Sequence, residues 1–336
     1  MSTTFWVTTN CNLNCKYCYE GEEKLNKVMS KEIIDKAIGF TLDNLNNTKK
    51  NLKVAIHGGE PFLVFDKMKY IVNEFKAKCS ELDKTTTFLT TTNATILNDE
   101  IIDFIVNEMP DITVSIDGTK ETHDKNRTFK NGCGSHDIAM ENSLKLLKLL
   151  PNIRLRMTFD SDSVEDLYKD VKYLIDLGFK FIVPAPNLFD ENWDIEHIKI
   201  LESQIKCIKE YIGNRTDVNI SLIDKTIYKI KGNCSGGKNG FHIYPNGKLY
   251  PCLLAGGNEL FEIGDIFNGV DINKRNCILS HSKKLNPDCN GCKLYNLCDG
   301  PRCKIINKLV TDDYYSAPPM QCALENLKYK INLLQQ

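Results

Sequence analysis

The sequence has almost no net charge, no targeting segment and no long apolar run, and each of these absences excludes a class of protein. Its 43 basic and 44 acidic residues give a formal net charge of −1, so no global positive field would attract nucleic acid or an anionic membrane. The first ten residues contain no lysine or arginine, which argues against a secretory signal. No run of about 18 apolar residues occurs, so we expect no membrane span and a cytoplasmic protein.

Cysteine, in contrast, is abundant, with 14 residues among 336. Disulfides are rare in reducing compartments, so clustered cysteines in a cytoplasmic chain indicate metal ligands. Ten of the cysteines fall into motif-like sets: Cys11, Cys15, Cys18, Cys234, Cys252, Cys289, Cys292, Cys298, Cys303 and Cys322. The other four are scattered, and we expect them to be packed as small side chains.

Strand-like and helix-like segments alternate through the first two thirds of the chain. Strands are predicted over residues 5–9, 52–56, 85–92, 112–116, 153–159 and 179–183. Each is followed by a helical segment, and these begin near Ser30, Phe65, Asn98, His136, Ser163 and Asp194. Such alternation predicts an α/β fold of right-handed βαβ units with a parallel sheet, and six repeats are fewer than the eight of a closed TIM barrel.

Three cysteines lie in a short segment directly after the first predicted strand: Cys11-Asn-Leu-Asn-Cys15-Lys-Tyr-Cys18. Thiolates are soft ligands that suit iron–sulfur clusters and zinc. A cubane cluster normally takes four cysteines, one for each iron. This segment offers three, so one iron would stay open to bind a substrate. A structural zinc knuckle is the alternative interpretation.

Polar motifs follow the next three strands, where parallel sheets usually carry their chemistry. His57-Gly-Gly-Glu-Pro61 follows the second strand, and Thr92-Asn93 follows the third. Ser115-Ile-Asp-Gly118 and then His123-Asp-Lys-Asn-Arg127 follow the fourth. Glycines allow close approach of the backbone to a ligand and leave amide donors exposed.

These motifs together resemble those of the radical S-adenosylmethionine (radical SAM) enzymes. The match includes Tyr17, the aromatic residue before the third cysteine, and it departs at Ala94, where the family has glycine after Thr-Asn. The resemblance implies a partial (β/α)6 TIM barrel whose N-terminal [4Fe–4S] cluster binds SAM at its open iron. Reductive cleavage of SAM would then give a 5′-deoxyadenosyl radical that abstracts a substrate hydrogen. It also implies these SAM contacts: Tyr17, Gly58, Gly59, Glu60, Asn93, Ser115, Asp117 and Arg127.

The last third of the chain is rich in glycine and cysteine. Residues 241–252 predict a hairpin about a type I′ turn at Asn246-Gly247. The cysteine spacing resembles the SPASM extension of radical SAM enzymes, which holds two auxiliary [4Fe–4S] clusters. The resemblance thus divides the chain into a barrel over residues 1–215, a bridge over 216–232, and a SPASM domain with a C-terminal helix over 233–336.

Carried over by position, the resemblance assigns two auxiliary ligand sets. The outer cysteine set is Cys289, Cys292, Cys298 and Cys322, and the inner cysteine set is Cys234, Cys252 and Cys303. Four residues separate Cys298 from Cys303, where the family usually has three. The inner set has only three cysteines, so its cluster would have an open iron or a ligand from elsewhere. Structural zinc sites are again the alternative.

SPASM proteins mostly modify peptides or protein side chains, so the resemblance implies an oxidative maturase. The first expectation is a maturase that forms thioether or carbon–carbon crosslinks in a ribosomally synthesised precursor peptide. The alternative is an anaerobic sulfatase-maturating enzyme that forms formylglycine, against which stands the missing fourth inner cysteine. A small-molecule dehydrogenase and a non-enzymatic zinc-binding interaction protein are further alternatives.

The partners follow from the same resemblance. An external low-potential electron donor of the flavodoxin or ferredoxin type would reduce the N-terminal cluster. Because the cysteine loop begins at residue 11, we expect no N-terminal peptide-recognition domain. The leader of the precursor would then bind the barrel, the SPASM surface or a separate leader-recognition protein. No residue can be chosen from the sequence as the catalytic base.

Overall fold

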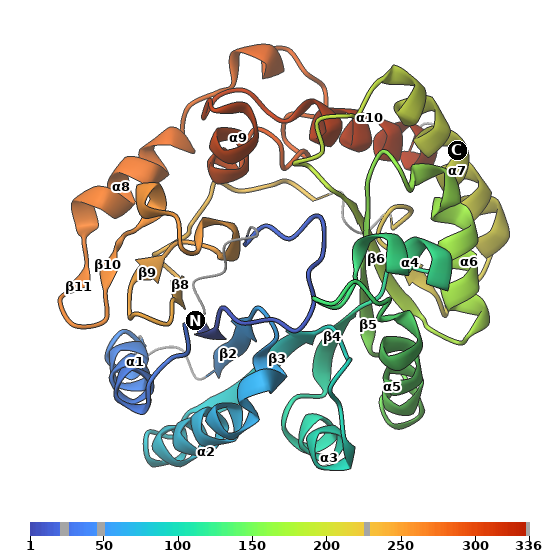
Figure 1. The fold of residues 1–336 in the computed structure, drawn as a ribbon. Coiled ribbons are helices and arrows are strands. Elements are labelled where there is room, and N and C mark those ends of the chain that lie inside the picture. The colour runs from blue at the N-terminus through green and yellow to red at the C-terminus, as the bar shows by residue number, and fades with distance from the viewer. Residues whose placement is uncertain (21–26, 46–50, 225–228, 334–336) are drawn as a thin grey trace. The chain divides into compact units, whose positions relative to one another are not determined.

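A computed structural model describes residues 1–20, 27–45, 51–224 and 229–333 of the chain (Figure 1). The chain forms two compact units, and each unit combines an N-terminal segment with part of the last third. The first unit comprises residues 1–14, 18–113 and 235–280; the second comprises 15–17, 114–234 and 281–336. The predicted domain boundaries at residues 215 and 232 stay a prediction, and part of the predicted bridge lies outside the described residues.

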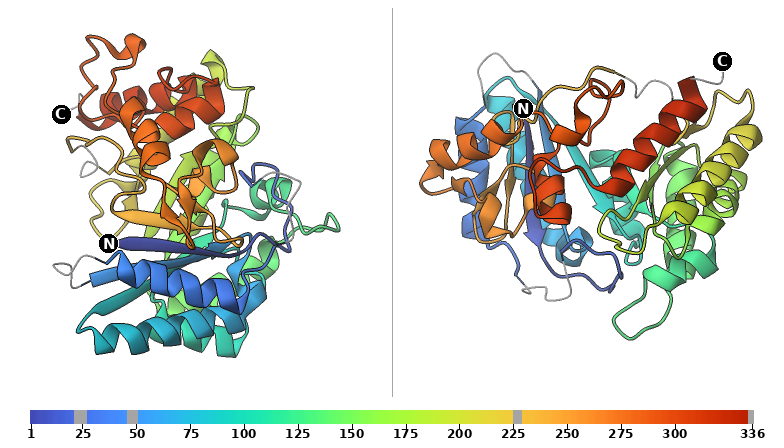
Figure 2. Two further views of the ribbon diagram at one scale, coloured as in Figure 1. Left: turned by 90° about the vertical axis from the view of Figure 1, so that its left-hand side faces the viewer. Right: turned by 90° about the horizontal axis from the view of Figure 1, so that it is seen from above.

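A sheet forms the centre of the first unit, with the strand order β3-β2-β1-β8-β9. Strands β1 (Ser2–Thr8), β2 (Asn51–Gly58) and β3 (Thr85–Thr92) are parallel, and β8 (Gly240–Ile243) pairs parallel with β1. The helices are α1 (Lys31–Asp43), α2 (Phe65–Glu81), α3 (Asp99–Glu108) and α8 (Ile272–His281). A short hairpin joins β10 (Gly264–Asp265) to β11 (Gly269–Val270). The last third of the chain thus extends the sheet of the N-terminal repeats (Figure 2).

The second unit contains the parallel strands β5 (Arg154–Phe159), β6 (Phe181–Pro186) and β7 (Asn219–Ile220). The boundary between the units falls within β4 (Asp111–Ser115). The helices of the second unit are α4 (Lys120–Asn126), α5 (His136–Leu149), α6 (Leu167–Asp176), α7 (Ile195–Ile212), α9 (Lys304–Thr311) and α10 (Pro319–Leu333). The C-terminal α10 packs along α7, where Lys330 pairs with Glu202 at 2.8 Å (Figure 1).

All six predicted strands and all six predicted helices of the repeats are present, and local chemistry explains where the helices begin. Ser30 Oγ accepts a hydrogen bond from Ile33 N, and α1 starts at the next residue. Asp194 and His197 form a reciprocal capping box at the start of α7. Strand β1 forms part of the core, with Phe5, Trp6 and Val7 at most 1% exposed.

Two features differ from the sequence prediction. The hairpin between β8 and β9 (Leu249–Tyr250) is present, but its turn is not type I′. That turn needs positive φ at both central residues, whereas Gly247 has φ +82° and Asn246 is not in the left-handed region. Gly247 N donates to Tyr244 O at 2.8 Å, so the turn is centred on the two residues before Gly247, and the left-handed glycine follows them. The helix α4, which carries the His123–Arg127 motif, was not predicted.

Several short elements complete the described chain. Turns of 3₁₀ helix occur at Pro61–Val64, Val164–Asp166, Leu253–Ala255, Glu259–Phe261 and Pro287–Cys289. Within the described residues, no helix is long and apolar enough to cross a membrane.

Candidate active site

The cysteine loop follows β1 and begins in the core. Cys11 is 8% exposed, whereas Cys15 and Cys18 are half-buried. Leu13 N donates to Cys11 Sγ at 3.4 Å, and Asn93 Nδ2 lies 3.8 Å from the same sulfur. Hydrogen bonds to sulfur favour the thiolate form that binds metal, so the surroundings of Cys11 suit a cluster ligand.

Gly58 and Gly59 bring the end of β2 into close contact with the chain that leads into this loop. Gly59 N donates to Thr8 O at 2.9 Å, and Glu60 N donates to Asn10 O at 2.8 Å. A Cβ atom on Gly59 would lie 2.5 Å from Asn10 O, a distance that real side chains do not tolerate. The glycines therefore position the residue before Cys11, in addition to any contact with a ligand.

Glu60 connects the ends of β2 and β3 within the first unit. The side chain is 1% exposed, and its carboxylate accepts hydrogen bonds from Thr92 Oγ1 at 2.9 Å, Asn93 N at 2.8 Å and Phe62 N at 3.2 Å. Burial raises the pKa of Glu60 to about 7, because these three neutral donors offset only part of the cost of removing the charge from water.

The Thr92-Asn93 element is also tied to the cysteine loop. Asn93 Nδ2 donates to Asn12 Oδ1 at 2.9 Å, and Asn12 Nδ2 donates to Thr95 Oγ1 at 2.7 Å. Ala94, which stands where the family has glycine, has φ +58°. Glycine adopts this left-handed conformation without strain, which explains the family preference and shows that the departure leaves the loop shape intact.

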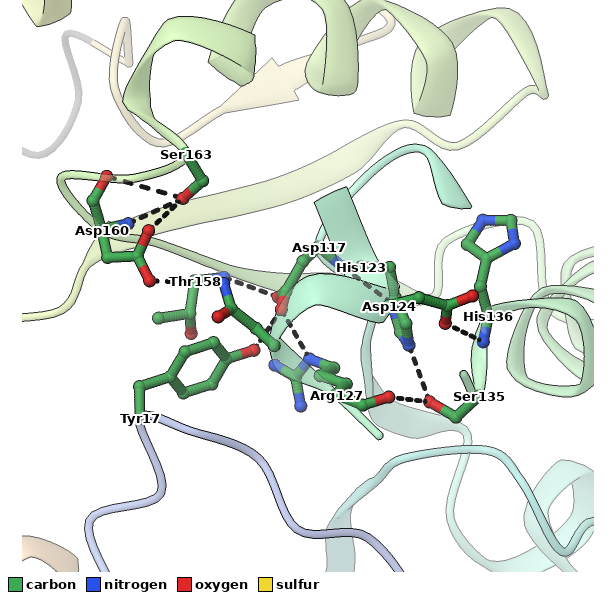
Figure 3. A network of polar contacts seen from close by, with 11 residues as sticks. Tyr17, Asp117, His123, Asp124, Arg127, Ser135, His136, Thr158, Asp160 and Ser163 are labelled. Carbon is green, nitrogen blue, oxygen red and sulfur yellow. Dashed lines mark hydrogen bonds and ion pairs between the residues drawn. The ribbon is translucent and has the colours of Figure 1, made fainter. Parts of the chain in front are cut away.

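Asp117, at the end of β4, gathers three donors in the second unit (Figure 3). Its Oδ2 accepts from Tyr17 Oη and from Arg127 Nε at 2.9 Å, and its Oδ1 accepts from Thr158 N at 2.9 Å. Asp117 is fully buried and Arg127 is 7% exposed. Burial lowers the pKa of Arg127, but the Asp117 charge outweighs it, so the pKa lies above its ordinary value and the pair is ionic.

Tyr17 thereby attaches the cysteine loop to this ion pair. Its ring lies 5.2 Å from the Arg127 guanidinium carbon, and Lys16 N donates to Asn126 O at 3.0 Å. Burial and the neighbouring Asp117 raise the pKa of Tyr17 well above its ordinary value, although Arg127 opposes the shift, so the phenol stays a hydrogen-bond donor. The residues between Cys15 and Cys18 are therefore held by the motifs that follow β4.

The histidines near the strand ends have structural partners. His123 Nδ1 accepts from Asp117 N at 3.3 Å, and its Nε2 lies 3.0 Å from Ser135 Oγ, which donates to Arg127 O (Figure 3). Burial lowers the pKa of His123 to about 2. His57 Nε2 lies 2.8 Å from Tyr19 Oη, and burial lowers its pKa to about 4. Both rings are neutral at physiological pH.

The outer cysteine set lies together in the second unit. Burial raises the pKa of Cys298 to about 11, and the thiols of Cys322 and Cys289 contribute to this rise. Gly300 N opposes the rise, because it donates to Cys298 Sγ at 3.3 Å. Burial raises the pKa of Cys289, with further contributions from Cys292 and Cys322. Such mutual effects require the four thiols to be neighbours, and ionisation of thiols with raised pKa values is the step that a bound metal favours.

The structure brings two members of the inner cysteine set together. Burial raises the pKa of Cys303, and Cys234 contributes, so these two lie near each other in the second unit. Cys252 belongs to the first unit, at the end of the β8–β9 hairpin. The predicted ligand assignments for this set stay a prediction.

The ligand types in these cysteine sets suit an iron–sulfur cluster. In the described part of the chain, no three His, Cys, Asp or Glu side chains are arranged as ligands of a single metal ion. A cubane needs no such convergence, because each thiolate binds a different iron. The thiol donors, their burial and the N–H groups directed at Cys11 and Cys298 fit an iron–sulfur cluster.

Sequence reasoning missed several contributors to this site. Thr158 acts through its backbone amide, which leaves no signal in the sequence. Asn12 and Thr95 could have been suspected from their polarity beside the motifs, but their pairing needs the fold.

Ser115, which the sequence predicted as a SAM contact, is half-buried, as a ligand contact at a strand end would be.

The comparisons with known proteins agree with this geometry. A family model described as a 4Fe-4S single cluster domain matches residues 1–139, which include the cysteine loop and the motifs after the first four strands. That match leaves residues 140–336 unassigned.

Three curated relatives extend the match. The cysteine-type anaerobic sulfatase-maturating enzyme of Clostridium novyi is 26% identical over 329 residues, covering 87% of this chain and 84% of that protein. The antilisterial bacteriocin subtilosin biosynthesis protein AlbA of Bacillus subtilis is 26% identical over 80% of this chain. An uncharacterized protein of Methanocaldococcus jannaschii is 33% identical over 52% of this chain. The chain spans 58% and 59% of the lengths of these last two proteins.

Two solved structures share the fold. Native anSMEcpe with bound AdoMet superimposes with a TM-score of 0.82 at 20% identity, covering 98% of this chain and 96% of that one. Streptococcus suis SuiB bound to precursor peptide SuiA gives a TM-score of 0.66 at 18% identity, covering 96% of this chain and 75% of that one. The predicted α/β fold with a mainly parallel sheet is thus confirmed. In its strand-end motifs, its N-terminal 4Fe-4S domain and its fold, the chain is thus similar to radical SAM/SPASM enzymes.

Proposed function

We propose that the chain is an oxidative maturase that removes hydrogen from a side chain of a ribosomally synthesised precursor peptide and forms a thioether or carbon–carbon crosslink. The observation that carries the proposal is the gathering of the outer cysteine set, with Cys234 beside Cys303, in addition to the N-terminal cysteine loop. Auxiliary clusters at these thiols could accept the electron that a substrate radical releases in a net oxidation.

Each part of the site has a separate task in this proposal. When bound, the N-terminal cluster and SAM supply hydrogen-atom abstraction. Cys11, Cys15 and Cys18 would hold the cluster. The SAM site would be lined by Gly58, Gly59, Asn93 and Ser115. Those of them that belong to the first unit are already packed near the buried Glu60. Auxiliary clusters would be held by the outer and inner cysteine sets.

Arg127 and Tyr17 would bind SAM while Asp117 positions them. Arg127 uses Nε for Asp117, and its terminal nitrogens have no hydrogen-bond partner among the described residues, so they are available for the SAM carboxylate. Both oxygens of Asp117 already accept hydrogen bonds, so Asp117 acts through Tyr17 and Arg127.

Anaerobic sulfatase maturation is the second candidate. It is favoured by the Clostridium novyi relative and by anSMEcpe, which match nearly whole chain to nearly whole chain. The crosslinking candidate is favoured by the precursor peptide in the SuiB complex and by the AlbA relative. It is also favoured by the three-cysteine inner set, whose open iron would bind a substrate thiolate.

The first experiment reconstitutes the protein anaerobically beside a variant with Cys11, Cys15 and Cys18 changed to alanine. We expect about twelve irons in the wild type and about eight in the variant, with 5′-deoxyadenosine formed only by the wild type and an external reductant. Bound zinc and no 5′-deoxyadenosine would defeat the proposal.

Two peptides then separate the candidates by mass spectrometry. A precursor peptide encoded beside the gene should lose two hydrogens, whereas a cysteine peptide from a sulfatase should stay unchanged. Conversion of that cysteine to formylglycine, with no change in the precursor peptide, would assign the second candidate instead.

A further inference from the structure

Lys304 is a buried lysine beside the outer cysteine set. It is the first residue of α9, directly after Cys303, and only 2% of it is exposed. Its Nζ donates to Asn286 Oδ1 and lies 4.9 Å from the centre of the Tyr315 ring. Burial lowers the pKa of Lys304, and the Cys289 thiol opposes this shift, in agreement with an ammonium on that side of the outer set.

This lysine has no carboxylate partner within 4.0 Å among the described residues, unlike Lys308 and Lys328. Lys308, one turn later in α9, pairs with Asp312 at 2.6 Å, and Lys328 in α10 pairs with Glu325 at 2.9 Å. A buried charge without a counter-charge costs several kcal/mol, and proteins usually avoid this by pairing it. A negative group absent from the polypeptide would therefore stabilise Lys304.

Asn286 adds a buried donor that has no acceptor in the described part of the chain. The residue is fully buried, and its carbonyl oxygen accepts from Cys289 N at 3.0 Å. Lys304 donates to Oδ1 of the Asn286 amide, so Nδ2 points away from the lysine, and Nδ2 has no hydrogen-bond partner among the residues that the structure describes. Among the described residues, a buried cation without a counter-charge and a buried amide N–H without an acceptor thus accompany the outer cysteine set.

We propose that Lys304, oriented by Asn286, raises the reduction potential of a [4Fe–4S] cluster bound by the outer cysteine set. The inference rests on the proposed function, which places a cluster there. Four thiolates and a cubane core carry net negative charge, and one-electron reduction adds one more negative charge to the cluster. A buried cation stabilises the reduced form more than the oxidised form, because the attraction grows with the charge and is weakly screened. The pair would therefore favour the outer cluster as an electron acceptor.

The test uses the reconstituted full chain with Cys11, Cys15 and Cys18 changed to alanine, so that only auxiliary clusters are titrated. Lys304→Met should move one auxiliary midpoint potential to a more negative value and leave the other in place. Asn286→Asp should do the same, because a carboxylate within hydrogen-bonding distance neutralises the lysine. Lys304→Arg keeps the charge and should largely preserve the potential.

Lys284→Met is the matched control. Lys284 is exposed, and its Nζ lies 5.8 Å from the centre of the same Tyr315 ring. The substitution therefore removes an equal charge from the same neighbourhood, at a position where water screens that charge. An unchanged midpoint in Lys304→Met with full iron content would overturn the inference and leave the proposed function standing.

Iron content decides the remaining outcomes. If Lys304→Met and Lys304→Gln lose the outer cluster while Lys304→Arg keeps it, the positive charge is what holds the cluster, and the inference is supported. If Lys304→Arg loses the cluster as well, Lys304 is needed for packing only and the inference fails. Zinc in place of iron in the wild-type protein would defeat the proposed function itself, and the two failures are therefore distinguishable.

Discussion

Glu60 and Asp117 offer a comparison between the two units of the molecule. Both are buried carboxylates after a strand of the repeats, at 1% and 0% exposure, and each accepts three hydrogen bonds. Glu60 meets only neutral donors, and burial raises its pKa to about 7. Asp117 faces the Arg127 guanidinium at 2.9 Å, and the charges compensate each other.

The difference shows two ways to fix the ends of the cysteine loop. In the first unit, a carboxylate close to its protonation midpoint joins backbone segments through neutral hydrogen bonds. In the second unit, the ion pair between Asp117 and Arg127 positions Tyr17. It leaves the terminal nitrogens of Arg127 without a hydrogen-bond partner among the described residues. A neutral network holds the loop before Cys11 in place, and a charged one holds the loop after Cys15 and adds an anion-binding group. The comparison predicts that the two carboxylates respond differently to neutralisation.

The largest effect is expected for Asp117→Asn, which leaves the Arg127 charge buried and unpaired. We expect a loss of about 3 to 5 kcal/mol in the free energy of unfolding, measured by urea denaturation. The double variant Asp117→Asn with Arg127→Met should lose less, because no uncompensated charge remains. An equal or larger loss in the double variant would show that the charge is not what makes Asp117 necessary.

A surface pair provides a further control for this comparison. Lys31 and Asp35 are also 2.9 Å apart, but both side chains are substantially exposed. Asp35→Asn should have little effect on unfolding, because water and salt screen that pair. A similar loss at both sites would contradict the assignment of the Asp117 effect to burial.

Glu60 should give the second largest effect, and this effect depends on pH. Its pKa rises from 4.5 in the unfolded chain to about 7 in the fold, so the folded state holds the proton more tightly. Stability from this group is therefore complete below about pH 4.5 and is lost as pH rises towards 7, by on the order of 3 kcal/mol. Glu60→Gln resembles the protonated acid and removes this loss.

The measurement compares wild type and Glu60→Gln by urea unfolding at about pH 5 and about pH 7.5. The free energy of unfolding of the variant, relative to that of the wild type, should rise by about 2 kcal/mol between the lower and the higher pH. The buried neutral histidines are present in both proteins, so their contribution to the pH dependence cancels when one free energy of unfolding is subtracted from the other. A constant difference between them across this range would rule out a raised pKa for Glu60.

The pattern of strands and helices was predictable because each repeat buries one face, and that leaves a periodic signal. The strand-end motifs were predictable for the same reason, since a parallel sheet places them at one edge. The contacts that set the chemistry were not. Tyr17 reaches Asp117 across 100 positions, and Thr158 contributes only an amide. Lys304 looked like an ordinary charged residue, and its burial depends on how α9 packs in the fold.

The smallest expected effect concerns Ala94, the one departure from the family in the Glu60 network. Ala94 has φ +58°, where a side chain costs about 1–2 kcal/mol relative to glycine. Ala94→Gly removes that strain but loses a buried methyl group and increases the entropy of the unfolded chain, and these two losses offset most of the gain, so we expect a net gain of at most about 0.5 kcal/mol. Asp83→Gly, at φ 51° in a loop, should gain less, because aspartate tolerates this conformation better. A gain at Asp83 that equals or exceeds the gain at Ala94 would show that strain at Ala94 is already relieved, and the alanine would then be a neutral replacement in a loop held by Glu60.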